Sequence, residues 1–391
     1  MTRSIFYDHS HCDITIFRSH IQQVLRPKDV PHASEIESNV PIYEASSLLS
    51  DLSYSSSGAG RKSILEEWAN VLDNGPGVLV LRGLVTEIDI IDETSAAFND
   101  IIIQEKQASL GQGDHFATTG SNTRIWNSTQ KLCLAYPELF VRYFGNTILT
   151  SICEAWLGPG YQMTSQVNVV HPGGKPQTAH RDYHLGFQSS EVLQQYASHI
   201  HALSPALTLQ GAIAHCDMPL DSGPTKLLPY SQSFKAGYLA VRNTDFRNVF
   251  EQHYIQLALN KGDGLFFNPA LFHAAGANKT KSINRMVNLL QVSSAFGRSL
   301  ESLDRMAMTL ALYPSLLKLR KHMDIDQLHA AIASCAEGYS FPTNLDTDPP
   351  INGNAPESQA ELMRRALQEN LSMTKFKKIL RQQTSRRRAL I

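Results

Sequence analysis

The segment GDGLFFNPALFHAAGAN, residues 262–278, shows most clearly what kind of domain this chain forms. A Gly-Asp-Gly turn, a short apolar run and an Asn-Pro turn follow one another, and a second apolar run then presents a lone histidine, His273. Similar short strand-like runs, separated by Gly, Pro and Asp turns, cover residues 163–170, 206–216, 226–228, 264–267 and 285–292. Many short strands with such turns favour an all-β barrel or jelly roll over a parallel sheet with crossover helices.

Helical patterns lie on both sides of this β region. We expect a buried strand over residues 78–81 and helices over residues 63–72, about 87–103 and 137–156, with Thr86 as the N-cap of the second helix. After residue 299 the helical pattern returns, then residues 339–356 form a loop or linker, and residues 357–391 form a polar helix that becomes basic.

These patterns divide the chain into three parts. We predict an N-terminal extension over residues 1–60 with little regular structure, a central domain over residues 61–298 and a helical C-terminal extension over residues 299–391 with a basic tail. The β core of the central domain spans about residues 162–292.

Composition limits the classes of partner. The 391 residues are 42% hydrophobic and 18% charged, so the chain can bury a large core. The formal net charge of -1 gives no global attraction to nucleic acid or to an anionic membrane. We interpret the basic run Lys375–Arg388 as a solvated terminal segment rather than a nucleic-acid site.

The cysteines and the chain ends indicate a compartment. Five scattered cysteines without a Cys-x-x-Cys spacing argue against a disulfide framework or a zinc knuckle: Cys12, Cys133, Cys153, Cys216 and Cys335. Residues 1–26 lack a signal-peptide hydrophobic region, no run is long enough for a membrane span, and residues 388–391 are not a peroxisomal signal. We therefore expect an intracellular protein, in the cytoplasm.

A candidate metal site consists of His180, Asp182 and His273. On a strand, residues i and i+2 project from the same face, so His180 and Asp182 can reach one cation. With His273 they would form a 2-His-1-carboxylate triad, which leaves positions open on iron(II) for redox chemistry. A His-x-Asp triplet alone is weak evidence, and a lone histidine such as His273 is ordinarily a core residue bonded to a backbone carbonyl. Arg285 strengthens the metal hypothesis, because it begins the next strand-like run and offers a planar charged fork to a carboxylate.

The sequence resembles the phytanoyl-CoA dioxygenase family of iron(II)- and 2-oxoglutarate-dependent oxygenases. The matching pieces occur in the family's order over roughly residues 75–292, and they are residues 77–84, 157–159, 177–182, 221–224, 228–231 and 262–273, followed by Arg285. The combination is far more specific than any one piece.

This resemblance implies a fold and a set of roles. The fold would be mainly β with flanking helices, around a double-stranded β-helix (jelly roll, cupin-like) core. His180, Asp182 and His273 would be the iron ligands and the catalytic centre, and Arg285, helped by Thr280, would bind the distal carboxylate of 2-oxoglutarate. Gln177 would contact cosubstrate or substrate, although a strand-end hydrogen bond explains this residue equally well.

The resemblance also implies a reaction. A dioxygenase of this kind uses O2 as cosubstrate, releases succinate and CO2, and hydroxylates a small organic metabolite. Asp182 argues for oxygenation, because halogenating relatives have a small residue in its place. Desaturation, rearrangement or epimerisation of a natural product on the same scaffold is the alternative, and a non-catalytic metal-binding jelly-roll module is the rival from another class.

Substrate contacts are less defined. We expect Tyr183 and His184 beside the ligands to line the substrate pocket, together with Arg124 and Trp126, which precede the barrel where this family often builds a lid. His184 could equally be bonded to a strand neighbour, and a surface role suits Arg124 and Trp126 nearly as well. His215 with its neighbours resembles a ligand cluster only by composition, and we do not expect metal there. The long N- and C-terminal additions suggest a lid or a subunit contact, so a homo-oligomer is one of the alternatives.

Overall fold

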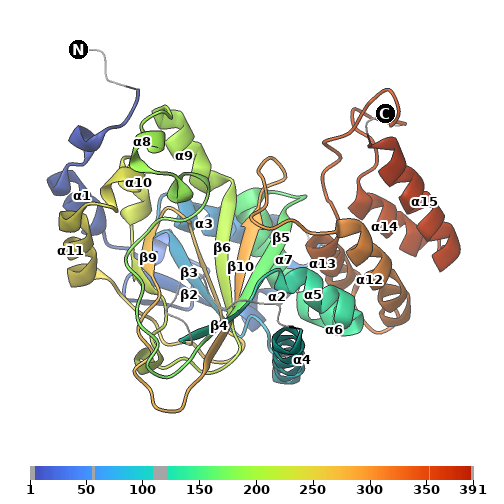
Figure 1. Ribbon diagram of the computed structural model, residues 1–391, viewed down its shortest axis with the longest axis horizontal. Coiled ribbons are helices and arrows are strands. Elements are labelled where there is room, and N and C mark those ends of the chain that lie inside the picture. Colours follow the sequence, from blue (N-terminus) through green and yellow to red (C-terminus); the bar gives the residue numbers. More distant parts are fainter. Residues whose placement is uncertain (1–4, 55–57, 109–120, 352, 389–391) are drawn as a thin grey trace.

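A mixed sheet forms the centre of the protein, in a computed structural model that describes residues 5–54, 58–108, 121–351 and 353–388 (Figure 1). Within these residues the sheet has eight strands in the order β1-β2-β3-β8-β6-β10-β5-β4, and β7 pairs with β9 separately. The strand bounds are β1 Glu35–Glu37, β2 Val40–Glu44, β3 Val78–Arg82, β4 Asn122–Ile125, β5 Gln162–Val170, β6 Thr208–Ala214, β7 Lys226–Leu228, β8 Gly264–Phe267, β9 Phe272–Ala274 and β10 Arg285–Ser293.

Helices surround this sheet. Their bounds are α1 Ile14–Ile21, α2 Ala45–Leu52, α3 Ala59–Asp73, α4 Ile88–Gln107, α5 Ser128–Ala135, α6 Pro137–Phe144, α7 Thr147–Leu157, α8 Ser190–Leu193, α9 Ser198–Ala206, α10 Gly237–Ala240, α11 Thr244–His253, α12 Arg305–Leu319, α13 Ile325–Cys335, α14 Gln359–Gln368 and α15 Met373–Arg386. Short 3-10 helices are η1 His9–His11, η2 Pro27–Asp29, η3 His184–Phe187, η4 Leu220–Ser222 and η5 Ser231–Ser233. No helix in the described ranges combines the length and hydrophobicity that crossing a membrane requires.

The two faces of the sheet differ in chemistry. β10 pairs antiparallel with β5 from Arg285↔Val170 to Ser293↔Gln162, and with β6 on its other side. Because side chains alternate along a strand, Met163, Val167 and Leu290 face the helices, while Gln166 and Arg285 face the opposite side. The second face is therefore apolar toward β2 and β3 but polar on β5 and β10.

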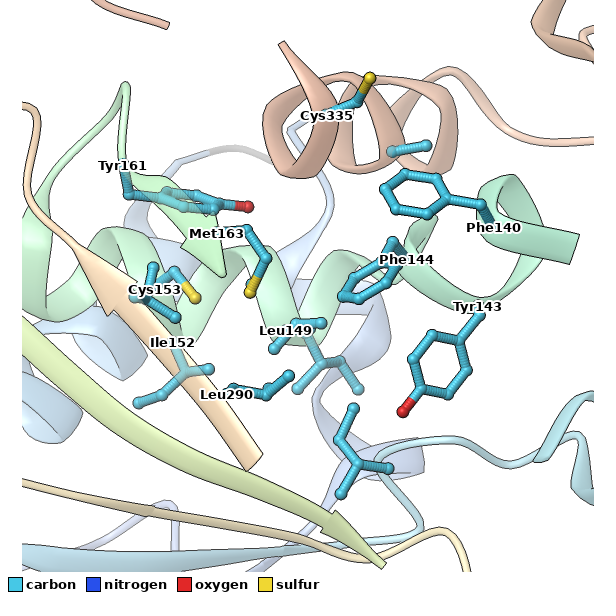
Figure 2. Packing of buried hydrophobic residues seen from close by; sticks show 14 of the residues in the cluster. Phe140, Tyr143, Phe144, Leu149, Ile152, Cys153, Tyr161, Met163, Leu290 and Cys335 are labelled. Carbon is cyan, nitrogen blue, oxygen red and sulfur yellow. The ribbon is translucent and has the colours of Figure 1, made fainter. Parts of the chain in front are cut away.

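The helix-covered face holds the main hydrophobic core. Figure 2 shows Leu149 and Ile152 of α7 near Met163 of β5 and Leu290 of β10, with Phe144 of α6 alongside. Each fully buried large apolar side chain contributes about 1.5–3 kcal/mol. This core holds the sheet rigid from one side and leaves the other side for chemistry.

A second, thin layer stands over the polar face. His273 on β9 pairs with Leu227 of β7 on one side and with His180 on the other, and Leu227 in turn pairs with Ile255. The segments around Ile255, Leu227, His273 and His180 thus lie next to one another, in this order, opposite the main sheet. This layer carries the histidines of the predicted metal site.

Most predicted elements of the central region are confirmed. The strand at 78–81 is β3, the helix at 63–72 lies within α3, and the five strand-like segments correspond to β5, β6, β7, β8 and β10. β6 begins only at Thr208, because α9 continues to Ala206. The predicted N-cap Thr86 is wrong: α4 is preceded by Glu87, and no side chain caps it.

The single helix predicted over residues 137–156 is in fact two helices, α6 and α7. The chain turns at Gly145, and Asn146 then caps α7 by accepting a hydrogen bond from Leu149 N at 2.9 Å. The apolar periodicity continues across the break, so it hides the capping signal of Asn146.

The expectation of little regular structure before residue 60 is also wrong. α1, β1, β2 and α2 lie there, and β2 joins the main sheet parallel to β3. Phe17 of α1 is fully buried against Phe234, Phe246 and Phe272. Through such additions helices occupy more of the described chain than strands do, so the mainly β balance that we expected does not hold.

The C-terminal region is helical, as predicted, but it forms several helices. α12 to α15 lie at one side of the molecule, and α1, α10 and α11 lie at the other (Figure 1). The predicted polar helix over 357–391 is divided into α14 and α15, and residues 389–391 lie outside the described residues. α15 buries Phe376 and Leu380 while its basic side chains face solvent. The five cysteines are unpaired, as expected.

Candidate metal centre

His180 and His273 stand side by side on paired backbones. His180 N donates to His273 O at 3.0 Å, and His273 N donates to His180 O at 3.2 Å. Asp182 N donates to Pro269 O at 3.0 Å. Residues 180–182 are not a regular strand, contrary to expectation, but these bonds alternate as in an antiparallel pair. His180 and Asp182 therefore project to the same side.

The three side chains converge. His273 Nε2 lies 3.4 Å from Asp182 Oδ2, and His180 Nε2 lies 3.7 Å from Asp182 Oδ1. One ligand atom from each residue lies within 4.8 Å of the others, and no other such group of three occurs in the described ranges. One metal ion can be held at this spacing by two imidazoles and a carboxylate.

Backbone carbonyls fix both imidazoles in the orientation that metal binding needs. His180 Nδ1 donates to Thr178 O at 2.8 Å, and His273 Nδ1 donates to Leu271 O, also at 2.8 Å. Since Nδ1 carries the proton, the Nε2 lone pairs face Asp182. The carbonyl bond that would explain His273 as a core residue is thus present, and it also prepares Nε2 as a ligand.

The charge states fit a metal site as well. Burial lowers the pKa of His180, His273 lowers it further, and Asp182 only partly opposes this, so the imidazole is neutral. Burial alone would raise the pKa of Asp182, but His180, His273 and Gln210 outweigh it and hold the pKa below its usual range. Neutral imidazole and ionised carboxylate are the forms that bind metals.

Two strands of the main sheet, β6 and β8, contact Asp182 and His273. Gln210 of β6 donates its Nε2 hydrogen to Asp182 Oδ2 at 2.5 Å, and the ring of Phe267 on β8 lies 4.8 Å from the His273 ring. The sequence analysis did not identify Gln210. The one indication was that it is a polar residue inside the otherwise apolar run of β6.

Arg285 is a buried cation on the polar face. It is 4% exposed, and its Nη1 donates to the carbonyl of Ser222 at 3.0 Å and weakly to that of Gly276 at 3.5 Å. Burial lowers the pKa of Arg285 to about 10, which leaves it charged at neutral pH. No carboxylate of the described residues forms an ion pair with it. A buried charge without a counter-ion is costly, so the site suits an anionic ligand.

Other buried polar atoms near the polar face also lack hydrogen-bond partners among the described residues. Asn168 Oδ1, Gln210 Oε1, Gln291 Oε1 and Tyr183 OH accept or donate no hydrogen bond within the described structure. The strand register places Asn168, Gln210 and Gln291 on the same face as Arg285. Buried polar groups are ordinarily satisfied, so this wall is suited to a ligand with several oxygen or nitrogen atoms. Sequence reasoning missed Asn168 and Gln291, because only the register assigns them to one face.

Gln177 and Thr280 lie in the loops around the cluster. Gln177 Oε1 accepts from Ala275 N at 3.2 Å, which is the strand-end bond that we weighed for this residue. The Thr280 hydroxyl donates to Asn278 Oδ1 at 2.7 Å, within the loop that leads into Arg285.

The chain changes direction directly after Asp182. Tyr183 and His184 have φ values of 58° and 41°, in the left-handed region, and His184 begins η3. The alternation of side chains that places His180 and Asp182 on one side therefore does not continue to His184. Tyr183 is buried, and its backbone strain is of the kind that concentrates at functional sites.

Arg124 and Trp126 lie at the edge of the polar face. Arg124 on β4 donates to Gln166 Oε1 at 2.7 Å, and its guanidinium carbon lies 5.1 Å from the centre of the Trp126 ring. The register Arg124↔Asn168 places Arg124 on the same face as the polar wall.

Both ring nitrogens of His215 have hydrogen-bond partners. Its ring bonds to Ser95 Oγ at 2.8 Å and to Tyr143 OH at 2.9 Å, away from the three converging ligands. Burial lowers the pKa of His215 to about 3.

Comparison with known families agrees with this geometry. The family described as Phytanoyl-CoA dioxygenase (PhyH) matches residues 74–287. This range includes His180, Asp182, His273 and Arg285.

Two curated relatives are fungal dioxygenases. Dioxygenase trt7 of Aspergillus terreus (strain NIH 2624 / FGSC A1156) is 21% identical over 206 residues, which cover 50% of this chain and 66% of the relative. Dioxygenase andF of Emericella variicolor is 23% identical over 172 residues, 43% of this chain and 54% of the relative. The matches thus span less than two thirds of either relative.

Among solved structures, the non-heme α-ketoglutarate-dependent epimerase SnoN of nogalamycin biosynthesis is 15% identical, with a TM-score of 0.42 over 60% of this chain and 82% of SnoN. The carbocyclase SnoK of the same biosynthesis is 19% identical, with a TM-score of 0.41 over 58% of this chain and 83% of SnoK.

Proposed function

Because the chain belongs to the phytanoyl-CoA dioxygenase family, we propose that it is an iron(II)- and 2-oxoglutarate-dependent dioxygenase that hydroxylates a small organic molecule. The observation that carries this proposal is the convergence of His180, Asp182 and His273 on the same side of the sheet as the unpaired cation Arg285.

The residues fit the cofactors. His180, Asp182 and His273 would hold iron(II), which supplies the site for 2-oxoglutarate chelation and O2 activation when bound. Arg285 would bind the distal carboxylate of 2-oxoglutarate, since its guanidinium fork has no carboxylate partner in the described chain. In this proposal Thr280 would help Arg285 to bind that carboxylate, and Gln177 would contact the cosubstrate or the substrate. Succinate and CO2 leave as co-products.

The fold supports the same proposal. The main sheet and the thin layer through Ile255, Leu227, His273 and His180 face each other, as the two sheets of a double-stranded β-helix do. In our division of the chain, a dioxygenase domain over residues 61–298 holds most of this core, and β1 and β2 of the N-terminal segment extend its main sheet. The unpaired cysteines support an intracellular location, which remains part of the proposal.

The outcome of the reaction depends on how the substrate lies. The polar wall and Tyr183 would orient an oxygen-bearing substrate, with His184, Arg124 and Trp126 at its margins. Desaturation, rearrangement or epimerisation needs the same ligands, so these outcomes differ from hydroxylation only in how the substrate is positioned. The carboxylate of Asp182 favours oxygenation over halogenation. A non-catalytic jelly-roll module with a structural metal would have no use for the unpaired Arg285.

Anaerobic titration tests the proposal. Addition of iron(II) and then 2-oxoglutarate to the full chain is expected to produce the weak visible charge-transfer band of the chelate. His180→Ala should abolish the band, and Arg285→Ala should require a higher 2-oxoglutarate concentration while iron binding stays unchanged. A folded wild-type protein without the band would point to the non-catalytic module.

A further inference from the structure

A cavity of about 400 Å³ adjoins the segment that carries two of the metal ligands. Its wall includes Arg181, Arg242 and Arg247, together with Tyr238, Gly186 and His180, and it contains no carboxylate. Arg181 lies between His180 and Asp182 in the sequence, and with Ala179 it lines this cavity. Three cations therefore surround one small space next to the proposed iron site.

Arg181 is the most deeply buried of the three. It is 3% exposed, and its Nη2 donates to the carbonyls of Ser231 at 2.6 Å and Phe234 at 3.1 Å. Its Nε is buried and has no hydrogen-bond acceptor among the residues that the structure describes. A Cβ on Gly237 would lie 1.9 Å from the guanidinium carbon, so only glycine at the start of α10 leaves room for this side chain.

Arg242 and Arg247 are held in the same way. Arg242 Nη2 donates to the carbonyl of Gln188, and Arg247 Nε donates to that of Val241 at 3.0 Å. Burial lowers the pKa of Arg242 and the charge of Arg247 lowers it further, whereas Glu191, an exposed residue of α8, is the nearby acid that opposes this. No ion pair within the described ranges includes any of the three arginines.

Within the described part of the chain, most of these guanidinium donors have no hydrogen-bond partner. A guanidinium has five N–H donors, and the bonds shown here use one nitrogen of each arginine. Carbonyls orient the three groups but do not neutralise them. Gathering one buried and two half-buried like charges is unfavourable unless a counter-charge is present, and planar guanidinium groups match the oxygen spacing of phosphate.

We propose that this cavity is an oxyanion site, and that the group it binds is a phosphate. Three positive charges without an acid in the wall match a dianion better than a carboxylate. The phosphate is either free in solution or part of the organic substrate, and the second case rests on the proposed dioxygenase function.

Calorimetric titration of the full chain with inorganic phosphate, without added iron or 2-oxoglutarate, tests the site directly. At constant ionic strength the wild type is expected to bind one phosphate saturably. Arg242→Gln/Arg247→Gln should weaken binding by at least about tenfold, since hydrogen bonds to charged groups are lost. Lys378→Gln/Arg381→Gln removes the same charge from the exposed face of α15 and should bind like the wild type.

Either of two results would overturn the site: no saturable binding by the wild type, or equal weakening by both double variants, which would indicate a general charge effect. The single variants Arg242→Gln and Arg247→Gln, checked by circular dichroism, replace the double variant if it does not fold.

Turnover identifies the source of the phosphate. If the site holds a substrate group, phosphate esters should stimulate succinate release more than their dephosphorylated counterparts, and Arg242→Gln/Arg247→Gln should remove the difference. If free phosphate is the ligand, it should change 2-oxoglutarate turnover without an organic substrate. The calorimetric titration needs no turnover. Its result would therefore stay valid even if the protein proved not to be a dioxygenase.

Discussion

Asp182 is positioned by two hydrogen bonds to distant parts of the chain. Gln210 donates to its Oδ2, and its backbone N–H donates to Pro269 O. A carboxylate held this way meets a metal without first losing conformational freedom. The proposed site is therefore preorganised by a strand that itself provides no ligand.

Gln210→Leu should reveal this contribution. Loss of a partner that orients a metal ligand weakens metal affinity by about 10–100-fold, so iron(II) affinity should fall by that factor. Anaerobic titration against a competing chelator measures the affinity. Gln291→Leu is the matched control, because Gln291 is paired with Gln210 in register and has no hydrogen bond to Asp182. Equal affinities for the two variants would show that Gln210 does not position the carboxylate.

Glu301 gives the protein a predictable pH dependence. Burial raises its pKa from 4.5 to about 6, although Asn127 N donates to its Oε1 at 2.7 Å. A carboxyl group whose pKa is raised on folding stabilises the protein below pH 4.5, and this contribution is lost as the pH rises through 6. Glu301→Gln mimics the protonated form, so it should raise the free energy of unfolding at pH 8 by at most about 2 kcal/mol.

Urea unfolding at several pH values would measure this difference. The gain from Glu301→Gln should shrink steadily below pH 6 and vanish near pH 4.5. A gain that is independent of pH would mean that the carboxyl group does not titrate as the structure implies.

His215→Gln separates a structural histidine from a ligand. The iron content of the folded protein should stay at the wild-type value, because the two ring nitrogens of His215 bond to Ser95 and Tyr143. Stability should fall by about 1–3 kcal/mol, since buried hydrogen-bonding groups lose their partner. Metal analysis of the purified variant is the measurement, and loss of iron would assign His215 to the site.

At this scale the sequence identifies residues whose chemistry is distinctive. His180, Asp182, His273 and Arg285 are recognisable from residue type, spacing and family resemblance, and the structure brings the three ligands together. Gln210 and Arg181 were not identified, because their roles depend on which strand or helix lies opposite them. Such contacts are set by register, which one sequence does not reveal.

At the scale of elements, the sequence predicts turns between strands better than it predicts breaks between helices. Glycine and proline placed the strands of the central region correctly, because a turn restricts the backbone locally. The break between α6 and α7 was missed, since apolar periodicity continues through it. There the local capping preference of Asn146 determines where a new helix begins.

Asn146→Ala should show how much this cap contributes. Its side chain accepts from Leu149 N and donates to Leu84 O at 2.7 Å, so it joins the start of α7 to the turn that follows β3. Loss of an N-cap costs about 0.5–2 kcal/mol, and the second bond places the expected loss near the upper end. Thermal unfolding would measure it, with the exposed Asn74→Ala as the control. No difference between the two variants would mean that the cap is dispensable.

At the scale of the whole molecule, the sheet separates stability from chemistry. α12 and α13 share the main core with α6 and β5, on the face opposite the proposed metal ligands. The N-terminal segment instead completes the sheet through β2 and covers α11 with Phe17. These long-range placements could not be predicted from periodicity, which describes one element at a time.

Phe376→Ala tests whether the C-terminal helices stabilise the domain without affecting its site. The Phe376 ring is fully buried and stacks on Tyr313 of α12, with ring centres 4.0 Å apart. The Tyr313 hydroxyl donates to the carbonyls of Ala366 and Leu371, so this pair joins α12, α14 and α15. Removing a buried phenyl ring costs about 3–5 kcal/mol.

We expect the urea midpoint of Phe376→Ala to fall in one cooperative transition, because α12 belongs to the same core as the sheet. Iron(II) affinity of the folded variant should equal that of the wild type, since the sheet stands between α15 and the ligands. Lys377→Ala, an exposed neighbour on α15, should change neither quantity. A second unfolding transition would mean that α14 and α15 unfold independently, and a lower iron affinity would mean that the C-terminal helices position the site.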